Sequence, residues 1–289
     1  MKVAIVTDSN AGLTNKEANE LGVFLVPMPF LIDNEEYFEN INLTQEMFYN
    51  KLEGESNVST SQPSIFAVKE LWDNILKEYD EIVHIPMSSA LSASYQTAFG
   101  AAIDYNGKVQ VVDNKRISVT QKQSVLDALK LVKNGKNAKE IKEELEKTSV
   151  NASIYIMLST LKYLKKGGRI TPAAAAIGGL LKIKPVLQIQ GEKLDKFAQV
   201  LTASQGKKRM IDQIEHDLLN RFSSLVKDKK IKIGMAYTNC YDKCLEFKQE
   251  ADIMLKKYGL KVEDINPLSL SVACHIGPGA IAVAAYYKE

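Results

Sequence analysis

The sequence predicts an α/β protein of two domains, with a mainly parallel sheet over residues 1–150 and a mostly antiparallel sheet over residues 151–289. In the first half, short apolar runs alternate with helical segments, which is typical of right-handed βαβ units. After about residue 150, hairpin signals replace that alternation. A chain of 289 residues also exceeds the usual size of a single domain, which is about 100–200 residues.

The strands expected in the first half are short apolar runs that end in polar residues. The opening run, Val3-Ala4-Ile5-Val6, is followed at once by Thr7-Asp8-Ser9, as in a buried strand that leads into a loop. Between residues 65 and 76, apolar residues recur at helical spacing. The other elements expected here are strands at 23–26, 81–85 and 109–112, helices at 43–52 and from about 95, and two helical segments that end near 147.

The clearest signal in the second half is a hairpin, in which two strands at 185–189 and 194–200 flank Gly191-Glu192. A long amphipathic helix is expected at 207–226 and a further helix at 243–257. A Lys-rich helix is expected to end at Gly167-Gly168, and the alanine-rich segment 172–182 is expected to be helical. The remaining strands of this half are expected at 154–158, 231–237, 261–265 and 280–286.

The composition excludes several classes of protein. Lys and Arg number 37 against 35 Asp and Glu, for a net charge of +2, so nucleic acid is not an expected partner. No apolar run approaches the roughly 18–20 residues that span a bilayer. The opening segment becomes polar after six residues, too early for a secretory signal. Three cysteines do not suggest a disulfide framework, so we expect a protein of the reducing cytoplasm.

Hydroxyl side chains gather in two loops that precede helices. Thr60-Ser61 precedes one helix, and Ser88-Ser89 with Ser92 precedes another. Such residues often serve only as helix caps. Two such loops on neighbouring parallel strands would, however, converge at the carboxyl edge of the sheet, where ligands of this class of fold bind.

The two loops suit a carboxylate better than a phosphate. Neither contains Lys or Arg, which a polyanionic phosphate usually recruits. Hydroxyls and backbone N–H groups can together hold a singly charged carboxylate. The chain also lacks a G-x-x-x-x-G-K-[ST] loop, a G-x-G-x-x-G after a strand and a G-x-S-x-G nucleophile elbow.

The cysteines and histidines allow more than one interpretation. Cys240, Cys244, Cys274 and His275 can be assembled into a zinc site on paper, but their spacing is not that of a zinc finger, so no metal is expected. His275 begins the glycine turn His275-Ile276-Gly277-Pro278-Gly279. It is therefore either a ligand contact or part of a structural turn.

Other residues remain equally open. Arg169 follows Gly167-Gly168 and either forms a structural salt bridge or steers an anion. The alanines at 173–176 with Gly178-Gly179 indicate either close helix packing or a groove for an apolar ligand. His84 is expected to be a hydrogen-bonded histidine of the core or a loop, and His216 is expected to be solvated.

Five motifs together resemble the DegV family of bacterial fatty-acid-binding proteins. They occur in the family's order and cover essentially the whole chain. The resemblance implies a Rossmann-like N-terminal α/β domain over 1–150, and a C-terminal α/β domain with a mostly antiparallel sheet over 151–289. It also implies a long-chain fatty acid buried in a tunnel between them. The motifs are Val6-Thr7-Asp8-Ser9, Thr60-Ser61-Gln62-Pro63-Ser64, Leu91-Ser92-Ala93-Ser94-Tyr95-Gln96-Thr97-Ala98, Gly167-Gly168-Arg169-Ile170 and His275-Ile276-Gly277-Pro278-Gly279-Ala280.

The resemblance also implies a set of ligand contacts. Thr60, with its neighbour Ser61, and Ser92 match the positions that hydrogen-bond the fatty-acid carboxylate, and the backbone N–H of Ala93 assists. His275 matches the histidine near the carboxylate. In such members the protein is a carrier without a cofactor and does not catalyse by itself. It presents the fatty acid to the catalytic subunit of a fatty acid kinase, and the acyl phosphate enters phospholipid synthesis.

One departure from the family affects the charge near the carboxylate. The family often has an arginine after the hairpin, and this chain has Ser204 or Gln205 at that place. Ala93 also stands where glycine is commoner. We expect carboxylate binding to survive both changes. Handover of an acyl phosphate would then need Arg169 or Lys207 to supply the missing charge.

Two alternatives to the carrier remain. The first is an acyl hydrolase or phosphotransferase with Ser92 as nucleophile, His275 as base and Asp8 as the residue that orients the base. The second is a regulatory module that binds another small carboxylate, which a narrow or polar tunnel would favour. Turnover of an activated ester that is lost on Ser92→Ala would favour the enzyme, and binding without turnover would favour the carrier.

Overall fold

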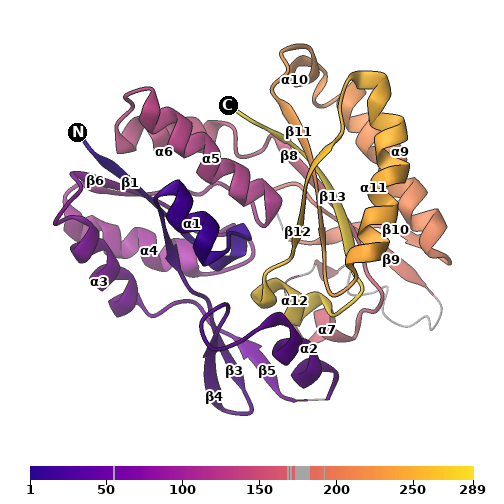
Figure 1. Ribbon diagram of the computed structural model, residues 1–289, viewed down its shortest axis with the longest axis horizontal. Coiled ribbons are helices and arrows are strands. Elements are labelled where there is room, and N and C mark those ends of the chain that lie inside the picture. The colour runs from indigo at the N-terminus through magenta and orange to yellow at the C-terminus, as the bar shows by residue number, and fades with distance from the viewer. Residues whose placement is uncertain (55, 168, 170, 173–182, 192) are drawn as a thin grey trace. The chain divides into compact units, whose positions relative to one another are not determined.

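The computed structural model describes residues 1–289 except 55, 168, 170, 173–182 and 192. The alanine-rich helix expected at 172–182 therefore lies almost entirely outside the described residues. The chain forms two compact units (Figure 1). The first consists of Met1–Val150 and Ser269–Ser271, and the second of Asn151–Leu268 and Val272–Glu289.

The first unit contains the parallel sheet that the sequence predicts. Its strands are β1 (Val3–Asp8), β2 (Val23–Val26), β6 (Glu81–Ile85) and β7 (Val109–Val111). They lie in the order β2-β1-β6-β7, and every neighbouring pair is parallel. The helices of this sheet are η1 (Ser9–Ala11), α1 (Asn15–Leu21), α3 (Ile65–Ile75), α4 (Ser94–Ala102), η2 (Ile103–Tyr105), α5 (Val119–Lys133) and α6 (Ala138–Lys147).

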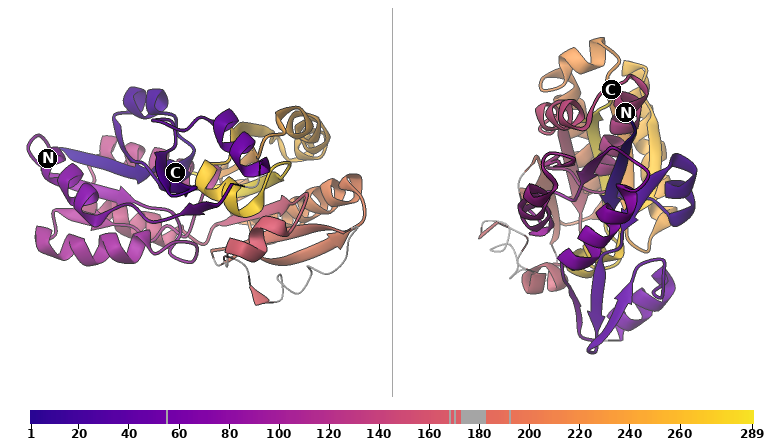
Figure 2. Two further views of the ribbon diagram at one scale, coloured as in Figure 1. Left: turned by 90° about the horizontal axis from the view of Figure 1, so that it is seen from below. Right: turned by 90° about the vertical axis from the view of Figure 1, so that its left-hand side faces the viewer.

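Helices cover both faces of this sheet (Figure 2). Successive residues of a strand point to opposite faces, so Val3 and Ile5 pack with α1, α5 and α6, whereas Ala4 and Val6 pack with α3 and α4. This arrangement leaves the loops after the strands free to carry polar groups.

A small antiparallel sheet was not expected from the sequence. Its strands β3 (Pro29–Ile32), β4 (Glu35–Phe38) and β5 (Val58–Thr60) lie in the order β4-β3-β5, and α2 (Gln45–Glu53) falls between β4 and β5 in the chain. Asp33 and Asn34 form the turn between β3 and β4 with φ of 53° and 71°. Two consecutive residues with positive φ are typical of the tight turn of a hairpin. The pair Asp33-Asn34 is therefore the sequence signal of this hairpin that was overlooked.

The second unit has a six-stranded sheet that is mostly antiparallel, as predicted. Its strands are β8 (Ala152–Met157), β9 (Lys184–Ile189), β10 (Asp195–Val200), β11 (Ile231–Tyr237), β12 (Val262–Pro267) and β13 (Ile281–Tyr287). They lie in the order β10-β9-β8-β13-β11-β12, and only β11 and β12 pair in parallel. Its helices are α7 (Lys162–Gly167), α9 (Ala203–Leu219), α10 (Ser223–Lys227), α11 (Tyr241–Leu255) and η3 (Lys256–Tyr258), together with most of α12 (Leu270–Ile276).

The long helix expected at 207–226 is in fact two helices. α9 begins earlier, at Ala203, because Thr202 and Gln205 form a capping box in which each side chain accepts a backbone N–H of the other. α9 ends at Leu219, and the N–H of Phe222 donates to the carbonyl of Asp217 over 2.8 Å. The ring of Phe222 is fully buried, so its burial accounts for the break before α10.

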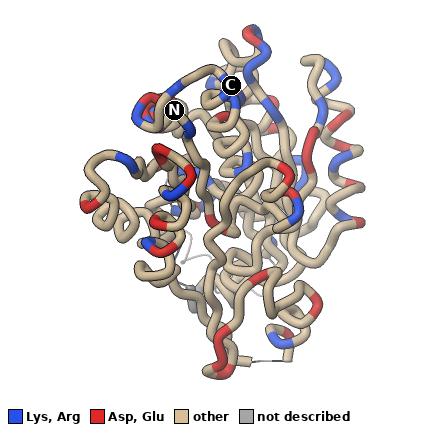
Figure 3. The backbone as a smooth tube through the Cα atoms, turned by 60° about the vertical axis from the view of Figure 1, so that its left-hand side comes forward, with Lys and Arg blue, Asp and Glu red and all other residues tan. Residues whose placement is uncertain are grey.

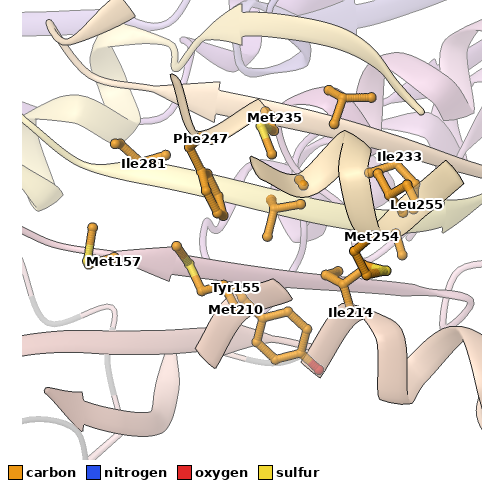
Figure 4. Packing of buried hydrophobic residues seen from close by; sticks show 14 of the residues in the cluster. Tyr155, Met157, Met210, Ile214, Ile233, Met235, Phe247, Met254, Leu255 and Ile281 are labelled. Atoms are coloured by element: carbon orange, nitrogen blue, oxygen red, sulfur yellow. The ribbon is translucent and has the colours of Figure 1, made fainter. Parts of the chain in front are cut away.

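The core of the second unit lies between the sheet and the helices α9 and α11 (Figure 4). Met210 and Ile214 of α9 and Phe247 and Met254 of α11 pack on residues of β8, β11 and β13. Tyr155 of β8 places its hydroxyl 2.7 Å from Asp217 of α9 and so joins that helix to the sheet by a buried hydrogen bond.

Three residues from late in the chain complete the first unit. Ser269 donates from Oγ to Asn10 Oδ1 over 2.9 Å, and Ser271 donates to the same atom. The N–H of Leu270 donates to Glu39 Oε2 over 3.0 Å. Burial raises the pKa of Glu39 to about 8. The helix α12 therefore starts in the first unit and ends in the second.

Charges are mixed along the chain. Lys and Arg, and Asp and Glu, are scattered over the backbone without a large region of one charge in the view of Figure 3. Among the described residues, no helix is long and apolar enough to cross a membrane.

Candidate functional site

The first hydroxyl loop starts where β5 ends. Thr60 is the last residue of β5 and pairs with Phe30 of β3. The N–H of Ser61 donates to the carbonyl of Pro29 over 3.3 Å. Helix α3 has Ser64 as its N-cap, without a side-chain capping bond. Thr60 and Ser61 thus lie before the cap, so the capping interpretation does not account for them.

The second hydroxyl loop is built largely from its own serines. Ser88 is fully buried, and its N–H donates to the carbonyl of Arg116 over 2.9 Å. Ser89 donates from Oγ to Asp113 over 2.9 Å. Ser92 Oγ accepts the N–H of Ser94 over 3.1 Å and lies 2.8 Å from Ser94 Oγ. Ser88 and Ser89 therefore hold the loop in place, and Ser92 closes a turn at the exposed N-cap residue of α4, Ala93.

A hydrogen bond joins the two loops. Thr97 of α4 donates from Oγ1 to Oε1 of Gln62, which follows Ser61, over 3.0 Å. A pocket of the first unit lies between the same segments, and its lining includes Asp8, Pro63, Ile65, His84, Ser94 and Thr97. The two loops that the sequence singled out thus meet within one unit. They do not follow neighbouring parallel strands as expected, because Thr60 ends β5, which belongs to the antiparallel sheet β4-β3-β5.

Asp8 supports the second loop from below. Its carboxylate accepts the N–H of Met87 over 2.8 Å, the N–H of Asn10 over 3.0 Å and Nε2 of Gln121 over 3.1 Å. Burial raises the pKa of Asp8, and these hydrogen bonds oppose that rise. Both oxygens are occupied by partners of the first unit, which gives Asp8 a structural task other than the orientation of a catalytic base.

Two of the three histidines differ in their surroundings: His84 lies in the core, where it also lines the pocket between the loops, and His216 lies on α9 of the second unit. His84 is buried with its ring edge-on to Trp72, 5.5 Å between centroids, and burial lowers its pKa to about 3. Its Nδ1 has no hydrogen-bond partner among the described residues, contrary to the expectation of a hydrogen-bonded histidine. His216 is solvated as expected, with 65% of its side chain exposed.

The third histidine, His275, stands in the last turn of α12 and is partly buried. Burial lowers its pKa to about 4, and the positive charge of Arg169 contributes to the same shift. The imidazole is therefore neutral at neutral pH, with one nitrogen that can donate and one that can accept a hydrogen bond. Within the second unit, the structure brings together the residues of two predicted motifs, Arg169 and His275.

The other two predicted anion contacts have partners elsewhere. Gln205 Oε1 accepts the N–H of Leu201 over 3.0 Å and the N–H of Thr202 over 3.3 Å, as the capping box requires. Lys207 Nζ lies 2.9 Å from Glu250 of α11, and only 12% of its side chain is exposed. Both residues hold α9, whereas Arg169 is the cation that acts on His275.

The cysteines do not form a metal site within the described part of the chain, where no three residues of the metal-binding types gather. All three cysteines are free thiols. Cys240 Sγ donates to the carbonyl of Ala280 over 3.3 Å, and burial raises the pKa of Cys244 to about 12. They behave as small buried side chains.

Sequence reasoning missed two contacts, that of Thr97 with Gln62 and that of Thr238 with the glycine turn. Gln62 lies in the quoted Thr-Ser-Gln-Pro motif, but nothing in the motif identifies Thr97 as its partner. Thr238 follows β11 and makes hydrogen bonds to Gly277 and Ala280 of the glycine turn. Only the pairing of β11 with β13, which brings distant segments together, reveals that contact.

The chain is similar to curated proteins and to solved structures over nearly its whole length. The chain is 31% identical over 290 residues to a DegV domain-containing protein of Clostridium perfringens, covering 98% of this chain and 96% of that one. A structure described as fatty acid binding of a DegV family protein from Thermus thermophilus matches with a TM-score of 0.85 and 28% identity, over 99% of this chain and all of that one. DegV from Bacillus subtilis, described as a fatty acid binding protein, matches over 100% of both chains with a TM-score of 0.84 and 25% identity. The model of a family described as uncharacterised protein, DegV family, matches residues 2–288, and the chain therefore belongs to the DegV family.

Proposed function

We propose that this protein binds a long-chain fatty acid and carries it, with the carboxylate held by Thr60, Ser61, Ser92 and the backbone N–H of Ala93. The observation that carries the proposal is the Thr97–Gln62 hydrogen bond of 3.0 Å, which joins two hydroxyl loops that contain no cation. The fatty-acid binding of the Thermus and Bacillus proteins supports it.

The chemistry divides between head and tail of the ligand. Burial of ~16 methylenes at ~0.8 kcal/mol each would contribute ~13 kcal/mol before the entropic costs of binding. The tail therefore supplies most of the affinity. The hydroxyls orient the carboxylate and offset its desolvation.

His275 and Arg169 extend the proposal to a kinase partner. A neutral imidazole beside a guanidinium suits an anion that gains charge, as a carboxylate does when it becomes an acyl phosphate. We infer that the protein presents its fatty acid to a fatty acid kinase subunit, and that the acyl phosphate serves phospholipid synthesis. Arg169 takes the place of the arginine that Gln205 replaces. The three free thiols are consistent with a protein of the reducing cytoplasm.

Mass spectrometry of the bound lipid tests the carrier. The purified protein is denatured and extracted with organic solvent, and we expect near-stoichiometric fatty acid of about 14–18 carbons, because each buried methylene adds affinity. The Thr60→Ala/Ser92→Ala double variant should lose the lipid. Ser59→Ala is the matched control, since Ser59 is exposed and directly precedes Thr60 in β5, where successive side chains point to opposite faces. Lipid-free extracts of folded protein that also fails to bind added fatty acid would sink the proposal.

Turnover separates the carrier from the enzyme. We expect no hydrolysis of an activated acyl ester, because the carboxylate of Asp8, which would have to orient the base, is already held by hydrogen bonds within the first unit. Hydrolysis that disappears in Ser92→Ala would establish the enzyme instead.

Handover to the kinase is tested separately, with a purified bacterial fatty acid kinase subunit, ATP and hydroxylamine to trap acyl phosphate. Arg169→Met should keep the fatty acid and lose most of the trapped product. Lys207→Met, whose side chain is paired with Glu250, is the control and should keep both. Equal product from wild type and Arg169→Met would contradict the role of Arg169.

A further inference from the structure

One buried side chain closes the turn that follows His275. Thr238 comes directly after β11 and is fully buried. Its Oγ1 donates to the carbonyl of Gly277 over 2.7 Å and accepts the N–H of Ala280 over 2.9 Å. Its own N–H donates to the carbonyl of Ala280 over 3.0 Å, and its carbonyl accepts the N–H of Gly279 over 2.7 Å. A single residue thus makes four hydrogen bonds to the turn.

The glycines of this turn are in contact with two further side chains. Gly277 has a φ of +76°, and a Cβ there would overlap the ring of Tyr163. Gly279 has a φ of +82°, and a Cβ there would lie 2.6 Å from Ser159 Oγ, which donates to the carbonyl of Gly279 over 2.9 Å. The Tyr163 ring and the Ser159 side chain therefore confine the backbone of the turn. The backbone cannot move toward them unless these side chains move as well.

The turn is also joined to the helix that carries His275. At the end of α12, the N–H of Gly277 donates to the carbonyl of Ala273 over 2.8 Å, so the turn fixes the helical turn that carries His275. Tyr163, which lies against Gly277, belongs to α7, and Arg169 follows two residues after that helix ends.

We propose that Thr238 is a positioning residue. Its hydroxyl holds the glycine turn so that His275 keeps the orientation proposed for ligand binding. The proposal rests on the proposed function and deepens it.

A second threonine of the chain supplies a matched control. Thr120 is also fully buried, and its Oγ1 donates to the carbonyl of Ile117 over 2.7 Å and accepts the N–H of Ile117 over 3.2 Å. It lies in α5 of the first unit. Thr→Val at either position keeps the shape of the side chain and removes two comparable hydrogen bonds. Loss of stability alone should therefore be similar in both variants.

The experiment compares Thr238→Val, Thr238→Ser and Thr120→Val with wild type. It measures fatty-acid affinity and, from the NMR resonance of the His275 imidazole as a function of pH, the pKa of His275. The chain has three histidines, so the histidine resonance that is missing from the spectrum of His275→Ala is assigned to His275. In Thr238→Val we expect the pKa of His275 to rise from about 4 toward its usual 6.5, because a looser turn admits water. Affinity should fall about tenfold, the equivalent of one lost hydrogen bond. Thr238→Ser should restore both values, and Thr120→Val should change neither.

Coupling to His275 provides a second measurement. In the His275→Ala background, Thr238→Val should weaken binding by less than about twofold, since the residue that it positions is gone. If Thr238→Val does not fold, Ser159→Ala loosens the same turn from its other side and should produce the same shift in His275.

The proposal fails if Thr238→Val loses stability as Thr120→Val does and leaves both the titration of His275 and the affinity unchanged. If the wild-type protein binds no fatty acid, the proposed function fails. The titration of His275 in the ligand-free variants then still decides whether Thr238 positions it.

Discussion

The two units hold their candidate ligand groups by different means. In the first unit, one hydroxyl loop follows β5 of the antiparallel sheet and the other follows β6 of the parallel sheet, and one hydrogen bond between exposed groups, Thr97 to Gln62, joins them. In the second unit, His275 stands before a turn that four hydrogen bonds of the buried Thr238 close. Hydrogen bonds exposed to water contribute little, whereas a buried polar group without its partner costs about 1–3 kcal/mol.

This difference indicates a division of tasks. Loops at a sheet edge tolerate substitution, so the hydroxyl loops can vary without loss of the fold. The glycine turn cannot vary in this way, because side chains on both sides already touch its backbone. Substitutions within the glycine turn should therefore cost stability, and substitutions within the hydroxyl loops should cost affinity.

The largest effect should come from Gly277→Ala. The new Cβ would overlap the Tyr163 ring at a φ of +76°, and strain and overpacking together should lower the free energy of unfolding by about 4 kcal/mol. Urea unfolding followed by circular dichroism measures it. Gly259→Ala is the control, since its φ is +67° but no atom lies within 4 Å of the added Cβ. A loss there equal to that in Gly277→Ala would show that Tyr163 does not constrain the turn.

The next effect concerns Glu39 in the first unit. Its folded pKa of about 8 lies above its usual 4.5, so the stability that its proton contributes is full below about pH 4.5 and is lost as pH rises through 8. Wild-type protein should lose about 2 kcal/mol of unfolding free energy between about pH 6.5 and about pH 8.5. Glu39→Gln should remove this dependence.

The histidines act in the opposite direction. The pKa values of His84 and His275 are lowered to about 3 and about 4, so their effect on stability appears only as pH falls below about 6.5.

The pH dependence expected from Glu39 is measured by unfolding at each pH. Fluorescence of Trp72, the single tryptophan of the chain, reports the unfolding of the first unit. Glu36→Gln, at an exposed position, is the control and should show the same decrease of unfolding free energy with pH as wild type. The same decrease in Glu39→Gln would exclude Glu39 as its source.

A smaller effect is expected from the bond between the loops. Thr97→Val removes the donor to Gln62, and fatty-acid affinity should fall about threefold to fivefold, with stability within about 0.5 kcal/mol of wild type. Thr97→Ser should retain the affinity. Isothermal titration checks both, and a Thr97→Val protein that binds as tightly as wild type would show that the loops need no such bond.

The smallest effect is expected at Gln205 and tests whether this residue caps α9 or contacts the ligand. Gln205→Arg removes the capping acceptor of α9 and should cost about 0.5–1 kcal/mol of unfolding free energy. Gln205→Glu keeps an acceptor oxygen and should cost less. Chemical denaturation compares the two, and a stabilised Gln205→Arg would mean that the arginine finds an acid that offsets the lost cap.

The sequence predicted those parts of the fold that depend on neighbouring residues. The run Val3-Ala4-Ile5-Val6 faces helices on both sides, and a strand buried on both faces has a recognisable, continuously apolar sequence. The two hydroxyl loops were found for the same reason, since each stands at a helix start. The family resemblance then assigned their ligand.

Other parts depend on pairings between distant residues. β4 has the sequence Glu35-Glu36-Tyr37-Phe38 and is half exposed, so only its pairing with β3 makes it a strand. α12 is seven residues long, which is too short to show a helical period in its apolar residues. Thr238 is one threonine among many until β11 and β13 are paired.

The return of Ser269–Ser271 to the first unit has a consequence for synthesis of the chain. Asn10 and Glu39 find their partners in these residues, which leave the ribosome roughly 120 residues after Val150. At about 5–20 residues per second, the nascent first unit would wait about 6–24 s without the Leu270 N–H that Glu39 accepts. A fragment that stops at Val150 stays in that unfinished state, so the N-terminal unit reaches its final stability only when most of the polypeptide has been made.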